Sequence, residues 1–162
     1  MITSLVVLGL VTLQRLGEMA LASRNTRRLM ARGGREVGAA HYPLIVLLHA
    51  AWLTGLWLLA WNRDPVFGWL AVFVFLQVLR VWVITSLGGR WTTRIIVLGD
   101  APLVRRGPYR LVSHPNYLVV AGEIAVLPLA FHLPAYAALF FVLNAGMMWI
   151  RIRAENRALS GG

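Results

Sequence analysis

The sequence predicts an all-α integral membrane protein with five transmembrane helices, the last two paired as a helix-turn-helix hairpin. Of its 162 residues, 59% are apolar and only 14% are charged, and the mean hydropathy is +0.68. A soluble domain is usually about 45–50% apolar and about 25% charged. A chain this short buries too small a share of its surface to hide the apolar excess. We therefore expect residues 1–162 to form a single membrane domain, not a soluble globule or a disordered tail.

The predicted spans are apolar stretches close to the roughly 20 residues that a bilayer-crossing helix needs. They cover residues 2–22, 43–61, 66–87, 118–131 and 134–150. The fourth would measure about 21 Å at 1.5 Å per residue, against a hydrocarbon core of about 30 Å. It therefore crosses a thinned region or forms a shallow hairpin with the fifth, with His132, Leu133 and Pro134 as the turn.

The distribution of arginine predicts the orientation. All 16 basic residues are arginine, and the net charge is +10. Segments 23–42, 88–117 and 151–162 carry most of them, whereas segment 62–65 carries only Arg63 and the turn at 132–134 carries none. Because basic residues favour the cytoplasmic side, we expect an inner-membrane protein with its N-terminus outside and its C-terminus in the cytoplasm. The positive charge then reflects topology and attraction to anionic lipid, and no nucleic-acid partner is expected.

Polar residues inside the spans share one depth, in the predicted cytoplasmic half. They are Gln14, Arg15, Glu18, His49, Gln77, Arg80, Glu123, Asn144 and Arg151. Such residues are costly in a bilayer and suggest a functional site, so we expect a polar cavity open to the cytoplasm. The alternative is structural: Arg15 and Glu18 are three apart on one helix face and would pair, and Arg80 would extend to the interface.

Segment 88–117, GGRWTTRIIVLGDAPLVRRGPYRLVSHPNY, is expected to bind a ligand at the cavity mouth. Gly88 and Gly89 end the third helix, residues 95–97 favour a short extended piece, and Gly107-Pro108 favours a turn. Pro115 then forces an extended approach to the fourth helix. Exposed backbone N–H groups and a helix N-terminus can hold an anion such as a carboxylate.

These residues resemble the isoprenylcysteine carboxyl methyltransferase family. The resemblance covers roughly residues 85–158 and rests on Gly107, Tyr109, His114-Pro115 and Tyr117, followed by Glu123 and by Arg151–Glu155. It implies an integral membrane enzyme that transfers a methyl group from S-adenosylmethionine to the carboxylate of a lipid-modified cysteine. Ser113 departs from the family pattern, which usually has Arg before His-Pro.

The resemblance also implies roles for individual residues. The cofactor site would contain Gly107, Tyr109, His114, Pro115, Tyr117 and Glu155. Arg151 would face the acceptor, and Glu155 would complete the cofactor site or help to orient the substrate. We expect catalytic roles for Arg151, Glu155 and Glu123. We expect substrate contacts from Arg80, Arg90, Trp91, Glu18 and His49. Trp91 has an alternative use as an interface anchor.

The N-terminal half resembles a small bacterial subgroup of this family. The similar stretch is QRLGEMALASRNTRRLMARGGREVGAAHYP. That subgroup tends to accompany type III polyketide synthases, and the resemblance implies a long-chain phenol or enol as the methyl acceptor. A carboxylate acceptor needs only a cation such as Arg151, Arg80 or Arg90 to position it. A phenol has a pKa near 10 and needs a base, for which His114, Glu123 and Glu155 are the candidates.

Three other classes compete with this interpretation. A metal or haem protein would have to use His41, His49, His114 and His132, and the sequence has no Cys and no H-E-x-x-H motif, so no metal is expected. A small transporter or scaffold would show an internal repeat or paired broken helices, which we do not find in the sequence. A phospholipid N-methyltransferase-like enzyme belongs to the same wider superfamily.

Overall fold

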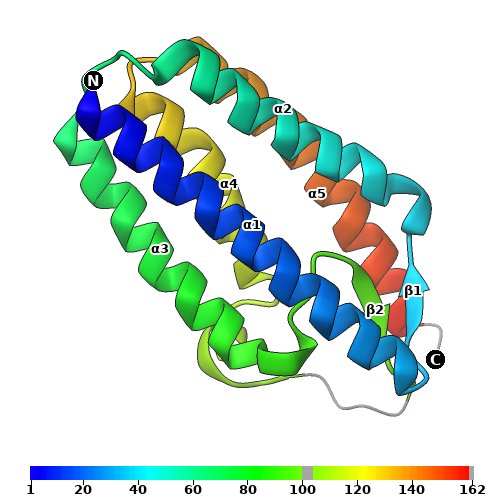
Figure 1. Ribbon diagram of the computed structural model, residues 1–162. Coiled ribbons are helices and arrows are strands. Elements are labelled where there is room, and N and C mark those ends of the chain that lie inside the picture. Colours follow the sequence, from blue (N-terminus) through cyan, green and yellow to red (C-terminus); the bar gives the residue numbers. More distant parts are fainter. Residues whose placement is uncertain (100–103, 161–162) are drawn as a thin grey trace.

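The computed structural model describes residues 1–99 and 104–160, the last two of these by their backbone only. In this part of the chain, five long helices form a bundle (Figure 1). They are α1 (Ile2–Ala31), α2 (Tyr42–Ala60), α3 (Phe67–Leu87), α4 (Pro115–Ala130) and α5 (Pro134–Ser160). The predicted helical class and the number of helices are thus confirmed.

Four of these helices, α1, α2, α3 and α5, are long and apolar enough to cross a membrane by length and composition. The fourth, α4, has 16 residues and is too short to meet that criterion. Large apolar side chains point outward from the bundle, among them Leu58 and Phe67, which are 72% and 74% exposed. Leu56 and Leu127 are fully buried between the helices. This distribution is typical of helices whose outer faces contact lipid.

Three helices are longer than the apolar stretches that predict them, and of these α4 differs least, since it covers residues 115–130 where 118–131 was predicted. The α1 helix continues past residue 22 to Ala31, and α5 continues past residue 150 to Ser160. Their extensions are rich in arginine, which favours helix almost as much as alanine does. Hydropathy therefore marks where lipid contact should end, whereas the helix itself runs on into the polar region.

The α4–α5 pair forms the predicted hairpin. Its turn includes His132, which has a positive φ of 58°, and the Val66 N–H donates to the Ala130 carbonyl at 2.8 Å. The end of α4 therefore lies level with the start of α3, against which α4 packs. With 16 residues against 21, α4 stops about 7 Å short of the other end of α3 at 1.5 Å per residue. The start of α4 is thus recessed inside the bundle.

A two-stranded antiparallel ribbon stands at that end of the bundle. It pairs β1 (Arg35–Val37) with β2 (Ile95–Val97), and Glu36 lies opposite Ile96. The extended piece predicted at residues 95–97 is confirmed, but the sequence analysis did not predict its partner, because residues 35–37 show no apolar alternation. Short 3-10 turns, η1 (Ala39–His41), η2 (Gly88–Arg90) and η3 (Gly107–Arg110), complete the connections. The ribbon and the C-terminal part of α5 lie opposite the N-terminus (Figure 1).

Candidate functional site

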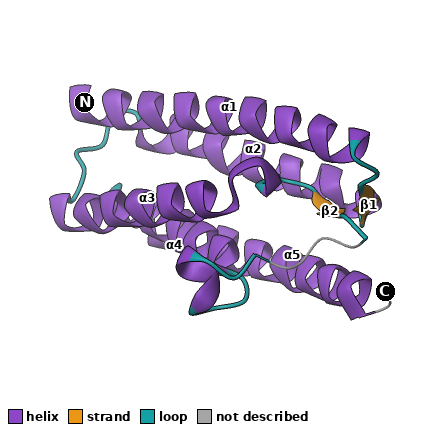
Figure 2. Cartoon of the chain, turned by 90° about the horizontal axis from the view of Figure 1, so that it is seen from below, coloured by secondary structure: helices purple, strands orange, loops and turns teal. Residues whose placement is uncertain are grey.

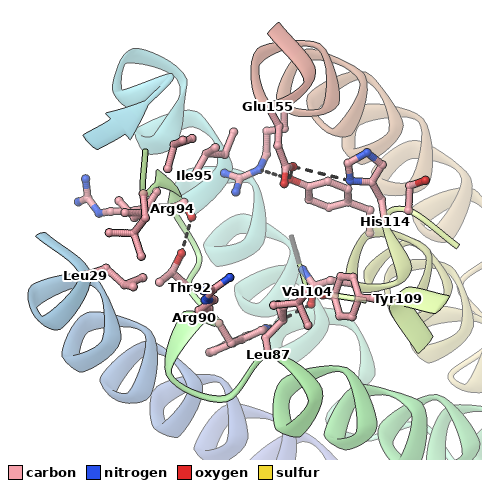
Figure 3. A pocket seen from close by; sticks show the side chains of 18 of the residues that line it. Leu29, Leu87, Arg90, Thr92, Arg94, Ile95, Val104, Tyr109, His114 and Glu155 are labelled. Atoms are coloured by element: carbon pink, nitrogen blue, oxygen red, sulfur yellow. Dashed lines mark hydrogen bonds and ion pairs between the residues drawn. The ribbon is translucent and has the colours of Figure 1, made fainter. Parts of the chain in front are cut away.

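A pocket of about 790 Å³ opens at the ribbon end of the bundle. Its wall is built from the end of α1, the end of α3, β2, η3, the start of α4 and the last turns of α5. Figure 3 shows Glu155 and His114 facing each other on one side, and Leu29 and Arg94 on the other. Segments far apart in the sequence therefore form one concave site of the size usual for small-molecule ligands.

The polar side of the pocket is a chain of four side chains from α4 and α5. The Tyr117 hydroxyl donates to Glu155 Oε2 at 3.0 Å and accepts from Arg151 Nε at 3.4 Å. His114 Nδ1 lies 3.7 Å from the same Glu155 oxygen, and its ring stacks on Tyr117 with centroids 5.4 Å apart. Arg151 is only 7% exposed. A buried cation, a carboxylate and an imidazole thus share one tyrosine as their common contact.

Aromatic side chains border this polar group. Tyr109 of η3 lines the pocket, and burial together with the nearby Glu155 carboxylate raises the pKa of its phenol. Tyr109 therefore stays neutral and able to donate a hydrogen bond at ordinary pH. Trp91 is buried in the wall, and its indole N–H lies 3.5 Å from Asn116 Oδ1 at the start of α4.

The opposite wall is held in place by the N-terminal half of the chain. Glu36 of β1 accepts two hydrogen bonds from Arg94 Nη1 at 2.7 and 2.9 Å, and the Arg94 guanidinium lies 4.1 Å from the Tyr42 ring centroid. The Tyr42 hydroxyl is 3.1 Å from Thr93 Oγ1, and Arg151 Nη2 donates to the Thr93 carbonyl at 2.9 Å. The ribbon is therefore connected to the polar group on α5.

Asn25 of α1 fixes the other end of this wall. Its amide is buried and donates to the carbonyls of Gly88 and Trp91 at 3.2 and 2.8 Å. Sequence reasoning missed Asn25, Thr93, Arg94, Tyr42 and Glu36, because no motif relates residues this far apart. One signal was available: Glu36 is one of only six acidic residues and stands in a segment rich in arginine.

Of the residues predicted from the sequence, the structure brings a large group to the pocket. That group is Arg90, Trp91, Tyr109, His114, Tyr117, Arg151 and Glu155. Gly107 and Pro115 do not line the pocket, but each begins an element that does, η3 and α4. Gly107 has a φ of +57° and packs so closely on Ser86 that a Cβ would lie 2.1 Å from the Ser86 hydroxyl. Pro115 is the buried first residue of α4.

The remaining predicted residues form a separate, closed network between α1, α3 and α4. Glu123 is 0% exposed and accepts hydrogen bonds at 2.8 Å from Arg15, Arg80 and Gln77. Glu18 accepts from Arg80 at 2.5 Å and from Arg15 at 3.1 Å. None of these residues lines the pocket. Arg15 and Glu18 thus make the pair that the structural alternative predicted, and Arg80 points into the bundle and not toward the interface.

His49 lies beside this network and outside the pocket. Its Nδ1 is 2.9 Å from the Ile45 carbonyl one turn earlier in α2. Of the polar residues expected to share one cavity, only Arg151 lines the pocket, whereas the others except His49 and Asn144 form the closed ion network. The Asn144 amide donates to Met148 Sδ at 3.3 Å, within α5. Within residues 1–99 and 104–160, no three His, Cys, Asp or Glu side chains gather as a metal site would require.

Comparison with known proteins identifies the family. The sequence profile of the isoprenylcysteine carboxyl methyltransferase (ICMT) family matches residues 69–161. The uncharacterized protein YpbQ of Bacillus subtilis is 37% identical over 158 residues, covering 94% of each chain. An uncharacterized protein of Haemophilus influenzae is 24% identical over 149 residues, covering 88% of this chain and 86% of that protein. No solved structure is significantly similar.

Proposed function

The chain belongs to the isoprenylcysteine carboxyl methyltransferase family, and on that premise we propose that it is an S-adenosylmethionine-dependent O-methyltransferase with a lipophilic, membrane-partitioned acceptor. The observation that supports this proposal most directly is the convergence of Tyr109, His114, Tyr117, Arg151 and Glu155 on one pocket. The acceptor is an isoprenylcysteine-type carboxylate or a long-chain polyketide hydroxyl. We place the pocket on the cytoplasmic side of the inner membrane, with the N-terminus outside.

The lining of the pocket fits the chemistry of this cofactor. S-adenosylmethionine, when bound, would supply an electrophilic methyl group on a sulfonium, which the acceptor oxygen would take in line with S-adenosylhomocysteine as the leaving group. It also carries a carboxylate, an ammonium group and an adenine ring. The pocket offers a guanidinium from Arg90, a carboxylate from Glu155, and aromatic faces from Trp91, Tyr109 and Tyr117. Cations attract aromatic faces and carboxylates, so each part of the cofactor has a matching group.

Holding the reactants in line would supply much of the rate acceleration, since correct orientation can contribute several kcal/mol. Arg151 is itself oriented by the Thr93 carbonyl and the Tyr117 hydroxyl, so we assign it to positioning the acceptor oxygen. For a hydroxyl acceptor, His114 and Glu155 are the groups that could take the proton. Glu123 is enclosed by three donors outside the pocket, and we assign it a structural role.

Binding of S-adenosylhomocysteine, the demethylated product, tests the cofactor. Calorimetry on the purified protein in lipid nanodiscs should show micromolar binding by the wild type. Tyr117→Phe should weaken S-adenosylhomocysteine binding about tenfold, because it removes the hydroxyl that donates to Glu155. A buried hydrogen bond to a charged group is worth roughly 1.5–3 kcal/mol. We expect the lower end of that range because Glu155 is partly exposed. Glu155→Gln should act in the same direction.

Two matched variants control for general damage. Tyr136→Phe removes a hydroxyl that bonds to the Ala51 and Trp52 carbonyls, outside the pocket. Asp64→Asn removes an exposed carboxylate at the opposite end. Both should bind like the wild type. A wild-type protein that gives no heat signal in detergent and in nanodiscs would contradict the proposal.

Methyl incorporation distinguishes the two acceptors. A farnesylated cysteine analogue and a long-chain alkylpyrone are compared with radiolabelled cofactor. If Arg151→Ala lowers transfer only to the carboxylate, the carboxyl acceptor is supported. If His114→Ala lowers transfer only to the pyrone, the hydroxyl acceptor is supported, because only that acceptor must lose a proton.

A further inference from the structure

The loop of residues 104–112, which contains η3, folds back against the last turn of α3. Arg106 Nε donates to the Ser86 carbonyl at 2.7 Å, and Gly107 packs on the Ser86 side chain. Ser86 lies inside α3, one residue before its end. The η3 turn therefore packs on the end of α3. In Figure 2 the loop stands out from the bundle beside the start of α4.

The tip of this loop is apolar and exposed. Leu111 is 77% exposed and Val112 is 41% exposed. The loop also reaches Trp82, whose indole nitrogen would lie 3.2 Å from a Cβ at Gly107 and whose ring is 44% exposed on the outer face of α3. An exposed tryptophan near the end of a span is typical of the membrane interface. The loop thus continues the lipid-facing surface of α3 at the depth of its last turn.

The same loop is strongly basic. Arg105, Arg106 and Arg110 are exposed on it, and residues 104–112 contain no acidic side chain. Guanidinium groups bind phosphate oxygens at two points, and each basic side chain near an anionic leaflet adds roughly 1 kcal/mol of attraction. An apolar tip surrounded by arginines is complementary to a partner that has phosphate groups at its surface and hydrocarbon chains beneath them.

We propose that residues 104–112 bind anionic phospholipid headgroups, with Leu111 inserted among the acyl chains. A soluble nucleic acid or an acidic protein would complement the arginines but not the exposed leucine beside a lipid-facing helix. Arg105, Tyr109 and Arg110 also line the pocket. Lipid bound here therefore holds the mouth of the pocket at the membrane surface. The inference does not depend on the reaction that the pocket supports.

The test compares lipid binding by two variants of equal charge. Arg105→Gln with Arg110→Gln removes two charges from the loop, and Arg28→Gln with Arg32→Gln removes two exposed charges from the end of α1. Protein in neutral detergent is titrated with phosphatidylglycerol in a phosphatidylcholine background, and the lipid-induced rise in unfolding temperature is followed by tryptophan fluorescence.

The loop variant should bind phosphatidylglycerol about 30-fold more weakly than the wild type, since each arginine contributes roughly fivefold. The α1 variant should change less than threefold. Equal weakening in the two variants, or no response of the wild type to phosphatidylglycerol, overturns the proposal. Soluble glycerol phosphate at the same concentration should have no effect, and a response equal to that of the lipid overturns it as well.

Leu111→Asn tests the insertion without changing the charge. It should weaken phosphatidylglycerol binding severalfold, whereas binding equal to that of the wild type overturns the insertion of the apolar tip. Unfolding in phosphatidylcholine alone shows whether each variant folds. If the arginine variant does not fold, Leu111→Asn carries the test.

Discussion

At the scale of single residues, Gly107 shows how a backbone requirement supports the pocket. It has a φ of +57°, and a Cβ would lie 2.1 Å from the Ser86 hydroxyl and 3.0 Å from Ser86 Cβ. The left-handed conformation alone costs a residue with a Cβ roughly 1–2 kcal/mol, and the clash adds to this. The close approach is what places η3, and with it Tyr109, against α3.

We therefore expect Gly107→Ala to lower the unfolding free energy by about 2–3 kcal/mol and to weaken S-adenosylhomocysteine binding. Thermal unfolding in detergent and calorimetry measure the two effects. Gly17→Ala is the matched control, because Gly17 lies within α1 with nothing near its Cβ position. It should be neutral or stabilising by up to about 1 kcal/mol. Equal stability of the two variants would contradict the requirement for glycine at position 107.

The sequence predicts some of the pocket residues well and others not at all. His114, Tyr117 and Glu155 were found because they resemble a family motif, and the structure brings them within hydrogen-bond or ring contact. The sequence also groups Glu123 with them, through the family resemblance and its depth in the bilayer, and Arg80 through its depth alone. Depth does not say which helix faces meet, so the closed network could not be separated from the open pocket.

At the scale of helices and strands, the main device is the ion network that joins α1, α3 and α4. Two arginines and two glutamates balance in charge, and Gln14 donates to Glu18 and to Gln77, which in turn donates to Glu123. In a bilayer, helices have little hydrophobic drive to associate, so such contacts set which faces pair. Because His114 caps α4 and Tyr117 lies in its first turn, the network also fixes where the pocket begins.

A double-mutant cycle measures this network. Glu123→Gln should cost about 3–5 kcal/mol of unfolding free energy, because it leaves an excess of buried positive charge. Adding Arg15→Gln restores neutrality, so the double variant should be more stable than the sum of the single effects by about 0.5–3 kcal/mol. Equilibrium unfolding in mixed micelles gives the values.

The partly exposed pair of Glu36 and Arg94 is the comparison. The same cycle there should give a coupling of roughly 0.2–1 kcal/mol, as for other solvent-accessible ion pairs. If the coupling at Glu123 is no larger than at Glu36, the network is not what holds the three helices together.

Strand pairing is the part of the fold that the sequence could not predict. Residues 95–97 are apolar and β-branched, so the sequence predicts their extended form. Residues 35–37 carry two charges and show no alternation of apolar and polar side chains, so the sequence does not predict a strand there. Their pairing depends on Asn25 and Tyr42, which hold the preceding and following segments against the pocket wall. Part of that wall is thus positioned by residues before position 69, outside the part matched by the family profile.

At the scale of the whole molecule, the packing of the helices brings the arginine-rich segments together at one end of the bundle. The ends of α1 and α5, the ribbon and η3 lie together, opposite the N-terminus and the α4–α5 turn (Figure 1). Basic residues remain in the cytoplasm when spans insert. The pocket, which opens among these segments, should therefore face the cytoplasm, where a soluble cofactor can reach it.

Because the chain contains no cysteine, single cysteines can be placed without removing any. Asn62→Cys, in the exposed α2–α3 connection, should react with an impermeant maleimide in intact cells. Arg28→Cys, at the end of α1, should react only after permeabilisation. Leu58→Cys is exposed on the spanning part of α2 and should react in neither case, because thiols ionise poorly in hydrocarbon and the thiolate is the nucleophile. If Arg28→Cys reacts in intact cells and Asn62→Cys reacts only after permeabilisation, the pocket lies outside the cell. The proposed orientation would then be wrong.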